Sequence, residues 1–274
     1  MTALVSYHIE DNIGVVKLCR PDKLNAISAD LKEQLIAALE RADADKETNV
    51  VLLEAEGRAF SVGFDIVGAS SNDDSAHNPF RWESILRNSM RMALTPWSMN
   101  KPVIAAVQGY ALGGGCELAM MCDLTIAAED AKFGEPEVRF SHVGPVMVMP
   151  WMVGLKRARE LVYFGDLIDA RTAMSYGMVN RVVPADELSA KARTYAKRLA
   201  LVSPEALRWA KRSIKNGAEV AGIRAALEAG VDSYVSLYAG RTQVNDEFAE
   251  RVQRDGLKAA LAWREGQFKA FELS

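Results

Sequence analysis

The stretch GYALGGGCELAMMCD, residues 109–123, places three consecutive glycines directly before an apolar segment with the pattern of a helix. Glycines at this position let the backbone approach a ligand closely, because no Cβ intervenes. The first N–H groups of a helix have no partner within it and form the positive end of its dipole. The pattern therefore suits an anion, or an oxygen that becomes anionic during a reaction. The alternative is that the glycines only permit tight packing of a helix on a strand.

A second glycine-containing loop, GRAFSVGFDI at residues 57–66, follows the predicted buried strand NVVLLEAE at residues 49–56. In open α/β sheets, ligands bind outside the carboxyl ends of the strands, where this loop is expected. One backbone N–H from each of the two loops would form an oxyanion hole. The alternative is an ordinary turn between a strand and a helix.

Two acidic positions are candidates for acid–base chemistry. Glu117 lies in the first turn of the predicted helix, and its apolar neighbours, residues 118–122, indicate a helix buried nearly all round. A buried carboxyl group has a raised pKa, which suits a general acid or base, although an acid in a first turn also simply stabilises a helix. The second candidate lies in KFGEPEVRF, residues 132–140, where spacing does not choose between Glu135 and Glu137.

The order of the predicted elements indicates an α/β protein with parallel strands. A hairpin at residues 7–20, with its turn at 11–14, precedes a helix that Ser28 would cap. Buried strands are expected within 49–57, 100–109 and 122–130, a polar loop at 68–80 and a helix at 81–94. Beyond Arg181 the patterns are helical. We expect a core at residues 1–200 and a helical region at 201–274 that packs on the core or on another subunit.

Composition excludes several classes of function. The chain has 274 residues, 49% of them hydrophobic, a net charge of -3 and a pI near 5.8, so neither nucleic acid nor an anionic membrane is an expected partner. The longest apolar run, residues 143–155, is too short to span a bilayer, and the first residues lack the pattern of a signal peptide. Three cysteines without a CxxC pair favour a reducing compartment, and we expect the cytoplasm.

Common site motifs are also missing from the sequence. Three histidines without HExxH spacing argue against a metal site. The absence of GxGxxG, GxxxxGK[ST] and GxSxG argues against a Rossmann dehydrogenase, a P-loop ATPase and an α/β-hydrolase.

The segment PVIAAVQGYALGGGCELAMMCDLTIAAEDAKFGEPEV, residues 102–138, resembles the central segment of the enoyl-CoA hydratase (crotonase) superfamily. RPDKLNAIS, GRAFSVGFDI and GLKRARELVYFGDLIDARTAMSYGMVNRVVP follow the order of the same family, so the resemblance covers essentially the whole chain. It implies a spiral of ββα units with a C-terminal helical region for trimer packing. It also implies an acyl-CoA thioester as substrate and a homotrimer or dimer of trimers as the assembly.

The resemblance also implies roles for individual residues. The backbone N–H groups of Phe64 and Gly114 would form the oxyanion hole, and the acid–base pair would be Glu117 and Glu137 rather than Glu135. By this analogy, water adds to a trans-2-enoyl-CoA, Glu117 activates the water and Glu137 delivers a proton to Cα. No metal or other cofactor is implied, since CoA is part of the substrate. The positions expected to contact CoA are Lys23, Leu24, Ala26, Val62, Asp65 and Ile66.

The sequence departs from the family's pattern after Glu137. The segment SHVGPVMVMPW, residues 141–151, is shorter than the corresponding segment of the family's pattern. Pro145 falls at or beside the position where the family has a glycine whose backbone N–H helps to hold the reacting water, and proline has no N–H. Met147, Met149 and Trp151 are interpreted as helix core or as part of an acyl pocket, and His142 as structural or facing the substrate. Val67 replaces a phosphate-binding lysine, which leaves Lys23, Arg58 or the C-terminal helices to contact phosphate.

Three activities remain open from the sequence. Hydration is favoured because both glutamates are present. The alternatives are another crotonase reaction, such as double-bond isomerisation or dehydration of a specialised acyl-CoA, and a catalytically silent homologue that binds acyl-CoA.

Overall fold

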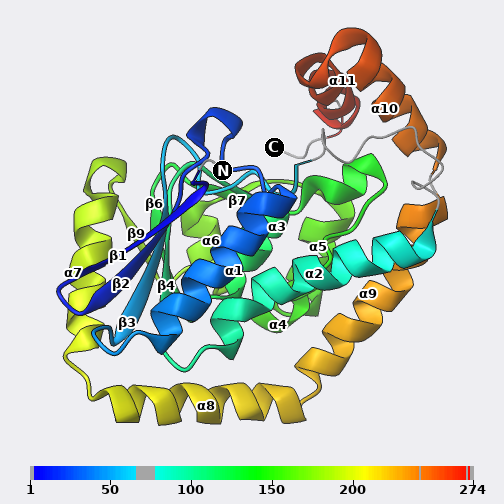
Figure 1. Ribbon diagram of the computed structural model, residues 1–274. Coiled ribbons are helices and arrows are strands. Elements are labelled where there is room, and N and C mark those ends of the chain that lie inside the picture. The colour runs from blue at the N-terminus through cyan, green and yellow to red at the C-terminus, as the bar shows by residue number, and fades with distance from the viewer. Residues whose placement is uncertain (1–2, 66–77, 241, 270, 272–274) are drawn as a thin grey trace.

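The computed structural model describes residues 3–65, 78–240, 242–269 and 271 (Figure 1). Within them, one sheet has the strand order β1-β2-β3-β4-β6-β9. β1 (Val5–Glu10) and β2 (Ile13–Leu18) form the predicted antiparallel hairpin, whose turn holds Asp11 and Asn12 at positive φ. The other neighbours pair in parallel, and β3 (Val50–Ala55), β4 (Val103–Val107) and β6 (Leu124–Ala128) are the predicted buried strands. The expectation of helical structure alone beyond Arg181 is wrong at its start, because β9 (Arg181–Val183) pairs in parallel with β6.

Both faces of this sheet are covered, which explains why its inner strands are apolar throughout. Alternate side chains point to opposite faces, so Leu53 and Ala105 join one hydrophobic cluster while Leu52 and Ile104 join the other. The first cluster lies under α1 (Ala29–Ala44), α2 (Pro79–Ser98) and α3 (Gly114–Met121), and the second under α7 (Leu188–Ala200). The alternation thereby fixes the side of the sheet on which α3 and its glutamate lie.

A smaller sheet joins the two central segments of the sequence. It consists of β5 (Tyr110–Leu112), β7 (Lys132–Gly134) and β8 (Ile168–Asp169). Gly113 donates its N–H to the carbonyl of Gly134 at 2.9 Å. The glycine run therefore lies beside the segment that carries Glu135 and Glu137.

Short helices connect these elements. They are η1 (Pro21–Lys23), η3 (Pro136–Phe140), α4 (Met149–Val153), α5 (Leu155–Phe164), α6 (Ala170–Tyr176) and η4 (Ala185–Glu187). The Ser28 side chain accepts the N–H of Leu31 at 3.3 Å, which confirms the predicted cap of α1.

The last third of the chain is helical, as predicted: α8 (Pro204–Val220), α9 (Ile223–Gly240), α10 (Gln243–Asp255) and α11 (Leu257–Lys269). α8 runs below the sheet and α9 packs against α2 (Figure 1). The Lys211 Nζ attaches α8 to the core, donating to Asp123 Oδ2 at 2.7 Å and to the carbonyls of Pro96 and Lys101 at 2.7 and 2.9 Å. The division into domains at residue 200 stays a prediction.

The helix predicted at residues 81–94 is longer at both ends. Asn78 caps it by accepting the N–H groups of Phe80 and Arg81, and Pro79 takes the first position, where its missing N–H costs nothing. Thr95 and Pro96 are buried, so packing carries the helix past its predicted end. The predicted loop at 68–80 therefore stops before Pro79, and residues 68–77 lie outside the described residues.

Candidate active site

The two glycine loops lie against each other. Ser61 donates its N–H to Tyr110 O, and Leu112 donates its N–H to Ser61 O, each at 2.9 Å. A Cβ built on Gly63, the residue before Phe64, would lie 3.4 Å from the backbone nitrogen of Gly114. The structure therefore brings the two segments that carry the predicted oxyanion donors, Phe64 and Gly114, into contact.

Two glycines of the run are required by what faces them. A Cβ at Gly114 would lie 2.7 Å from Phe64 Cζ, so the aromatic ring occupies the place of a side chain. Gly113 has a φ of 50°, and a Cβ there would lie 2.7 Å from Glu137 Cδ. Both glycines therefore pack closely against other predicted site residues, whereas the approach of their backbone to a ligand stays a prediction.

Glu117 is fully buried in the first turn of α3. Its Oε1 accepts the backbone N–H of Val146 at 2.6 Å, and its Oε2 has no hydrogen-bond partner among the described residues. Burial raises the pKa of this carboxyl group well above its ordinary value, and Glu135 and Glu137 raise it further, whereas the Val146 N–H lowers it. The environment is that of a group that can take up a proton.

Glu137 lies in η3, with its carboxylate beside Gly113. Part of the residue reaches the surface, but its Oε2 is enclosed and has no partner in the described structure. Burial raises the pKa of the Glu137 carboxyl to about 7. Glu137 can therefore hold a proton near neutral pH, which the general-acid role requires.

Glu135 is brought to the same place, although the resemblance assigns it no role. It is 2% exposed, and both of its carboxylate oxygens are enclosed without a partner among the described residues. A Cβ built on Gly144 would lie 3.2 Å from Glu117 Cδ and 3.6 Å from Glu135 Oε2. Three carboxyl groups thus share one buried region.

Two tyrosines of α9 border this region, and the sequence reasoning missed both. Tyr238 donates its hydroxyl to Val143 O at 2.9 Å, and its ring lies 4.4 Å from the ring of His142 and 4.9 Å from that of Trp82. Burial raises the pKa of Tyr234 to about 12, with further increases from Glu117 and Glu135. The signal was the four-residue spacing of the two tyrosines, which puts both on one helix face.

The segment 141–151 is divided between core and surface. Met149 is fully buried at the start of α4, in agreement with its reading as helix core, whereas Met147 packs partly buried against the core but precedes the helix. Trp151 is 40% exposed, so the helix-core interpretation is wrong for this residue: it lies on the outer side of α4. His142 contacts the carbonyl of Phe140 through Nδ1 at 2.9 Å, and burial lowers its pKa.

Four of the positions expected to contact CoA, Leu24, Ala26, Val62 and Asp65, lie together beside Phe64. Val62 donates its N–H to the carbonyl of Leu24 at 3.2 Å, and the Arg20 guanidinium bonds both Ala26 O and Asp65 Oδ2 at 2.8 Å. Lys23 is exposed at the end of η1. Ile66 and Val67 lie outside the described residues.

Asn25 links the loops that carry the positions expected to contact CoA, and the sequence analysis does not single it out. It is fully buried at a φ of 53°, and its side-chain amide donates to the carbonyls of Glu56 and Ala59 at 2.9 Å each. The Ser61 hydroxyl donates to Asn25 O, also at 2.9 Å. Asn25 thereby ties the loop after β2 to the loop after β3.

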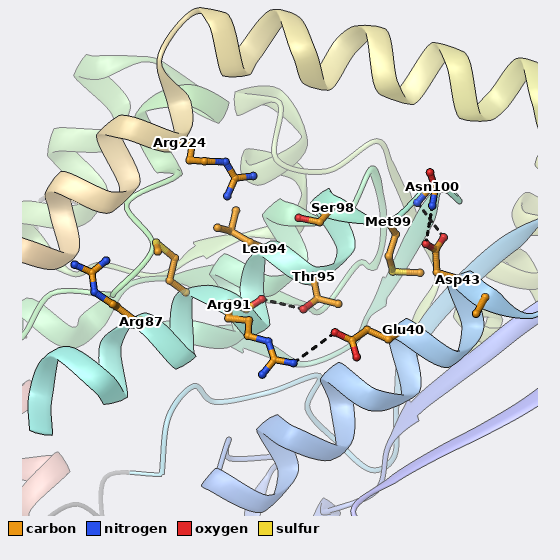
Figure 2. A pocket seen from close by; sticks show the side chains of 12 residues that line it. Glu40, Asp43, Arg87, Arg91, Leu94, Thr95, Ser98, Met99, Asn100 and Arg224 are labelled. Atoms are coloured by element: carbon orange, nitrogen blue, oxygen red, sulfur yellow. Dashed lines mark hydrogen bonds and ion pairs between the residues drawn. The ribbon is translucent and has the colours of Figure 1, made fainter.

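A separate hollow lies between the ends of α1 and α2 and the start of α9 (Figure 2). It contains none of the predicted site residues. Arg91 pairs with Glu40 at 3.5 Å, Arg224 with Glu219 at 2.8 Å, and Asp43 accepts two hydrogen bonds from Asn100. Because these groups satisfy one another, the hollow is not a candidate site.

No group of three potential ligand side chains among the described residues is arranged to hold a metal ion. No helix in the described part of the chain is long and apolar enough to cross a membrane.

Comparison with known proteins agrees with this geometry. The profile of the family described as "Enoyl-CoA hydratase/isomerase" matches residues 8–255. The chain is 35% identical to a "Probable enoyl-CoA hydratase" of Rhizobium meliloti (strain 1021), covering 95% of each protein, and 32% identical to a "Crotonyl-CoA hydratase" of Syntrophomonas wolfei, covering 94% of this chain and 95% of that protein. A crystal structure of an enoyl-CoA hydratase/isomerase from Xanthobacter autotrophicus Py2 superimposes with a TM-score of 0.92 at 36% identity, covering 98% of this chain and 99% of that one. The loops, carboxyl groups and fold described above therefore belong to a member of the enoyl-CoA hydratase/isomerase (crotonase) family.

Proposed function

We propose that this protein is an enoyl-CoA hydratase, which adds water reversibly to a trans-2-enoyl-CoA. One observation carries the proposal: Glu117 and Glu137 are enclosed together beside the two adjoining glycine loops. The names of the relatives support the general hydratase reaction.

In the proposed reaction, the thioester carbonyl lies between the N–H groups of Phe64 and Gly114. Glu117 takes a proton from water, and the resulting hydroxide equivalent bonds to Cβ. The electron pair of the double bond moves onto the thioester oxygen, where the two N–H groups stabilise the enolate. Glu137 then gives its proton to Cα and the enolate collapses. Losing one such N–H donor costs about 10²–10³ in rate in well-studied enzymes.

The two glutamates are suited to opposite roles. Burial raises the pKa of Glu117, and the Val146 N–H opposes this by favouring the ionised form, the form in which we propose that Glu117 acts as the base. Glu137, with a pKa of about 7, retains a proton to donate. We propose that the CoA portion lies along Lys23, Leu24, Ala26, Val62, Asp65 and Ile66. No metal or redox cofactor takes part in the proposed steps.

The activity is tested with crotonyl-CoA and a longer enoyl-CoA, by following loss of the absorbance of the conjugated thioester. Glu117→Gln and Glu137→Gln should each lower kcat by about 10²–10⁴-fold. Turnover that survives both changes contradicts the mechanism. Double-bond migration in a 3-enoyl-CoA without hydration would establish an isomerase, and CoA binding without any turnover would establish a silent acyl-CoA-binding homologue.

We also propose that the protein assembles as a homotrimer or a dimer of trimers. Large apolar side chains are exposed on α5 and α8, including Tyr163 at 68%, Trp209 at 62% and Ile214 at 73%. Light scattering coupled to size-exclusion chromatography measures the assembly, and a monomeric mass contradicts it.

A cytoplasmic location is proposed as well, in line with Cys19, Cys116 and Cys122, which are all free thiols. Fractionation of the source cells tests it.

A further inference from the structure

Glu135 is a buried acid that the proposed reaction does not use. It follows β7 directly and lies two residues before Glu137. Both of its carboxylate oxygens are enclosed, and neither receives a hydrogen bond from the described residues. A buried ionised carboxylate without a donor is costly, so this side chain calls for an explanation.

Its surroundings do not favour a third negative charge. Glu135 and Glu117 approach the same face of Gly144, with Glu135 Oε2 and Glu117 Cδ at 3.6 and 3.2 Å from the position of a Cβ there. Neighbouring carboxyl groups that are cut off from water cannot all be ionised.

The other titratable groups around the cluster are the thiol of Cys116 on α3 and the phenols of Tyr234 and Tyr238 on α9. His142 packs on the ring of Tyr238, and burial favours its neutral form. No lysine or arginine of the described chain acts on the three carboxyl groups. The cluster must therefore reduce its charge by retaining protons.

The hydrogen-bond donors determine where a proton stays. Glu117 receives the N–H of Val146 at 2.6 Å, which favours its ionised form, and the backbone of Glu137 lowers the pKa of that residue's own carboxyl group. Glu135 receives no hydrogen bond from the described residues. A carboxylic acid without a donor, but beside an acceptor, is the most stable holder of the proton.

We infer that Glu135 works as a neutral carboxylic acid and is a positioning residue, whose O–H group faces Glu117 and holds that carboxylate ionised and oriented. The inference rests on the proposed function, because it assigns Glu117 as the base. Only the proton's position is specified, and no bond to the substrate involves Glu135.

Loss of this proton at high pH has a direct consequence. An ionised Glu135 would repel Glu117 and offer it no donor, so hydration should fall as Glu135 ionises. Gln keeps a donor and cannot ionise, whereas Leu keeps the approximate volume and has no donor. These two substitutions separate the donor from the bulk of the side chain.

The experiment combines infrared spectroscopy with pH profiles of kcat/KM for crotonyl-CoA. The difference spectrum between the wild type and Glu135→Gln at neutral pH should show the carbonyl stretch of a neutral carboxylic acid. This measurement does not depend on catalytic activity. Glu135→Gln should keep kcat/KM within about tenfold of the wild-type value and extend the alkaline limb of the profile to higher pH. Glu135→Leu should lose about 10²-fold in kcat/KM, as expected of a misplaced base. Glu129→Gln, an exposed acid outside the site, is the matched control.

Each outcome has a defined meaning. A difference spectrum that shows a lost carboxylate instead of a lost acid overturns the inference, even if a variant is poorly folded. An unchanged alkaline limb in Glu135→Gln also overturns the inference. So does a loss of kcat/KM in Glu135→Gln that is as large as the loss in Glu135→Leu. If the wild type hydrates no enoyl-CoA, the proposed function fails, and the infrared band alone decides whether Glu135 is neutral.

Discussion

Val146 donates its backbone N–H to Glu117 Oε1 at 2.6 Å, and the residue directly before it, Pro145, has no N–H to donate. Within the segment 141–151, the hydrogen bond to the buried Glu117 carboxylate thus comes from the residue that follows the proline. Gly144, on the other side of Pro145, approaches Glu117 so closely that a Cβ would lie 3.2 Å from its Cδ. The unusual proline is therefore compatible with an intact acid site.

Removing the Val146 donor should impair the base. Val146→Pro leaves Glu117 without its one backbone N–H, so kcat should fall by about 10²-fold in the crotonyl-CoA assay because the carboxylate is no longer oriented. Val146→Ala, which shortens the side chain but keeps the N–H, is the control. Equal losses in the two variants would show that packing, rather than the hydrogen bond, matters here.

The contact between Gly114 and Phe64 predicts a rescue. Gly114→Ala should displace the Phe64 ring and reduce kcat/KM, because a Cβ would lie 2.7 Å from Cζ. The double variant Gly114→Ala with Phe64→Ala should recover part of the loss, since the obstruction is gone. A double-mutant cycle measures the coupling, and simple additivity of the two losses would count against the contact.

The raised pKa of Glu137 predicts a stability that depends on pH. Its carboxyl has a pKa of 4.5 when unperturbed and about 7 in the folded protein. The native state thus binds the proton more tightly, so this stabilisation is complete below pH 4.5 and is lost as pH rises through 7. The loss is on the order of 3 kcal/mol.

Urea unfolding at pH 5 and pH 8 measures this effect. Glu137→Gln should show a smaller decrease in the free energy of unfolding between the two values than the wild type does. The same decrease in both proteins would mean that Glu137 does not retain its proton.

Lys211 should be a stability residue and not an activity residue. Lys211→Met leaves Asp123 without its ammonium partner and two carbonyls without their donor, which should cost about 3 kcal/mol. Lys215→Met on the same helix removes a lysine that makes none of these bonds. Thermal unfolding distinguishes the two variants. Similar unfolding temperatures for Lys211→Met and Lys215→Met would refute the anchoring role of Lys211.

The sequence predicted many of the local elements, and the structure brings several of the proposed site residues together. The Ser28 cap, the hairpin turn and the glycine run all depend on neighbouring residues, and each was recognised for that reason. The pairing of Glu117 with Glu137 came from the family resemblance, since spacing left Glu135 equally eligible. The structure encloses carboxylate oxygens of all three acids, so burial does not separate Glu135 from Glu137 either.

Features that depend on contacts distant in sequence could not be predicted. Tyr238 reaches Val143 only because α9 packs on α2, and the Val146 donor depends on how the segment after η3 folds back over α3. Asn25 joins two loops by donating to main-chain carbonyls. Every residue has such a carbonyl, so the sequence does not show which ones Asn25 contacts. The end of α2 was misplaced because burial of Thr95 and Pro96 outweighs the tendency of proline to end a helix.

The border that Tyr234 and Tyr238 form around the acids has a consequence for how the chain matures. During synthesis, Glu117, Glu135 and Glu137 leave the ribosome long before α9 exists, and in water their carboxylates are ionised at neutral pH. In the folded chain oxygens of all three carboxyl groups are enclosed, so protons must be drawn from the medium as the site closes. Closure of the site is an acid-consuming step, and a weakly buffered refolding mixture should turn more alkaline as the chain folds.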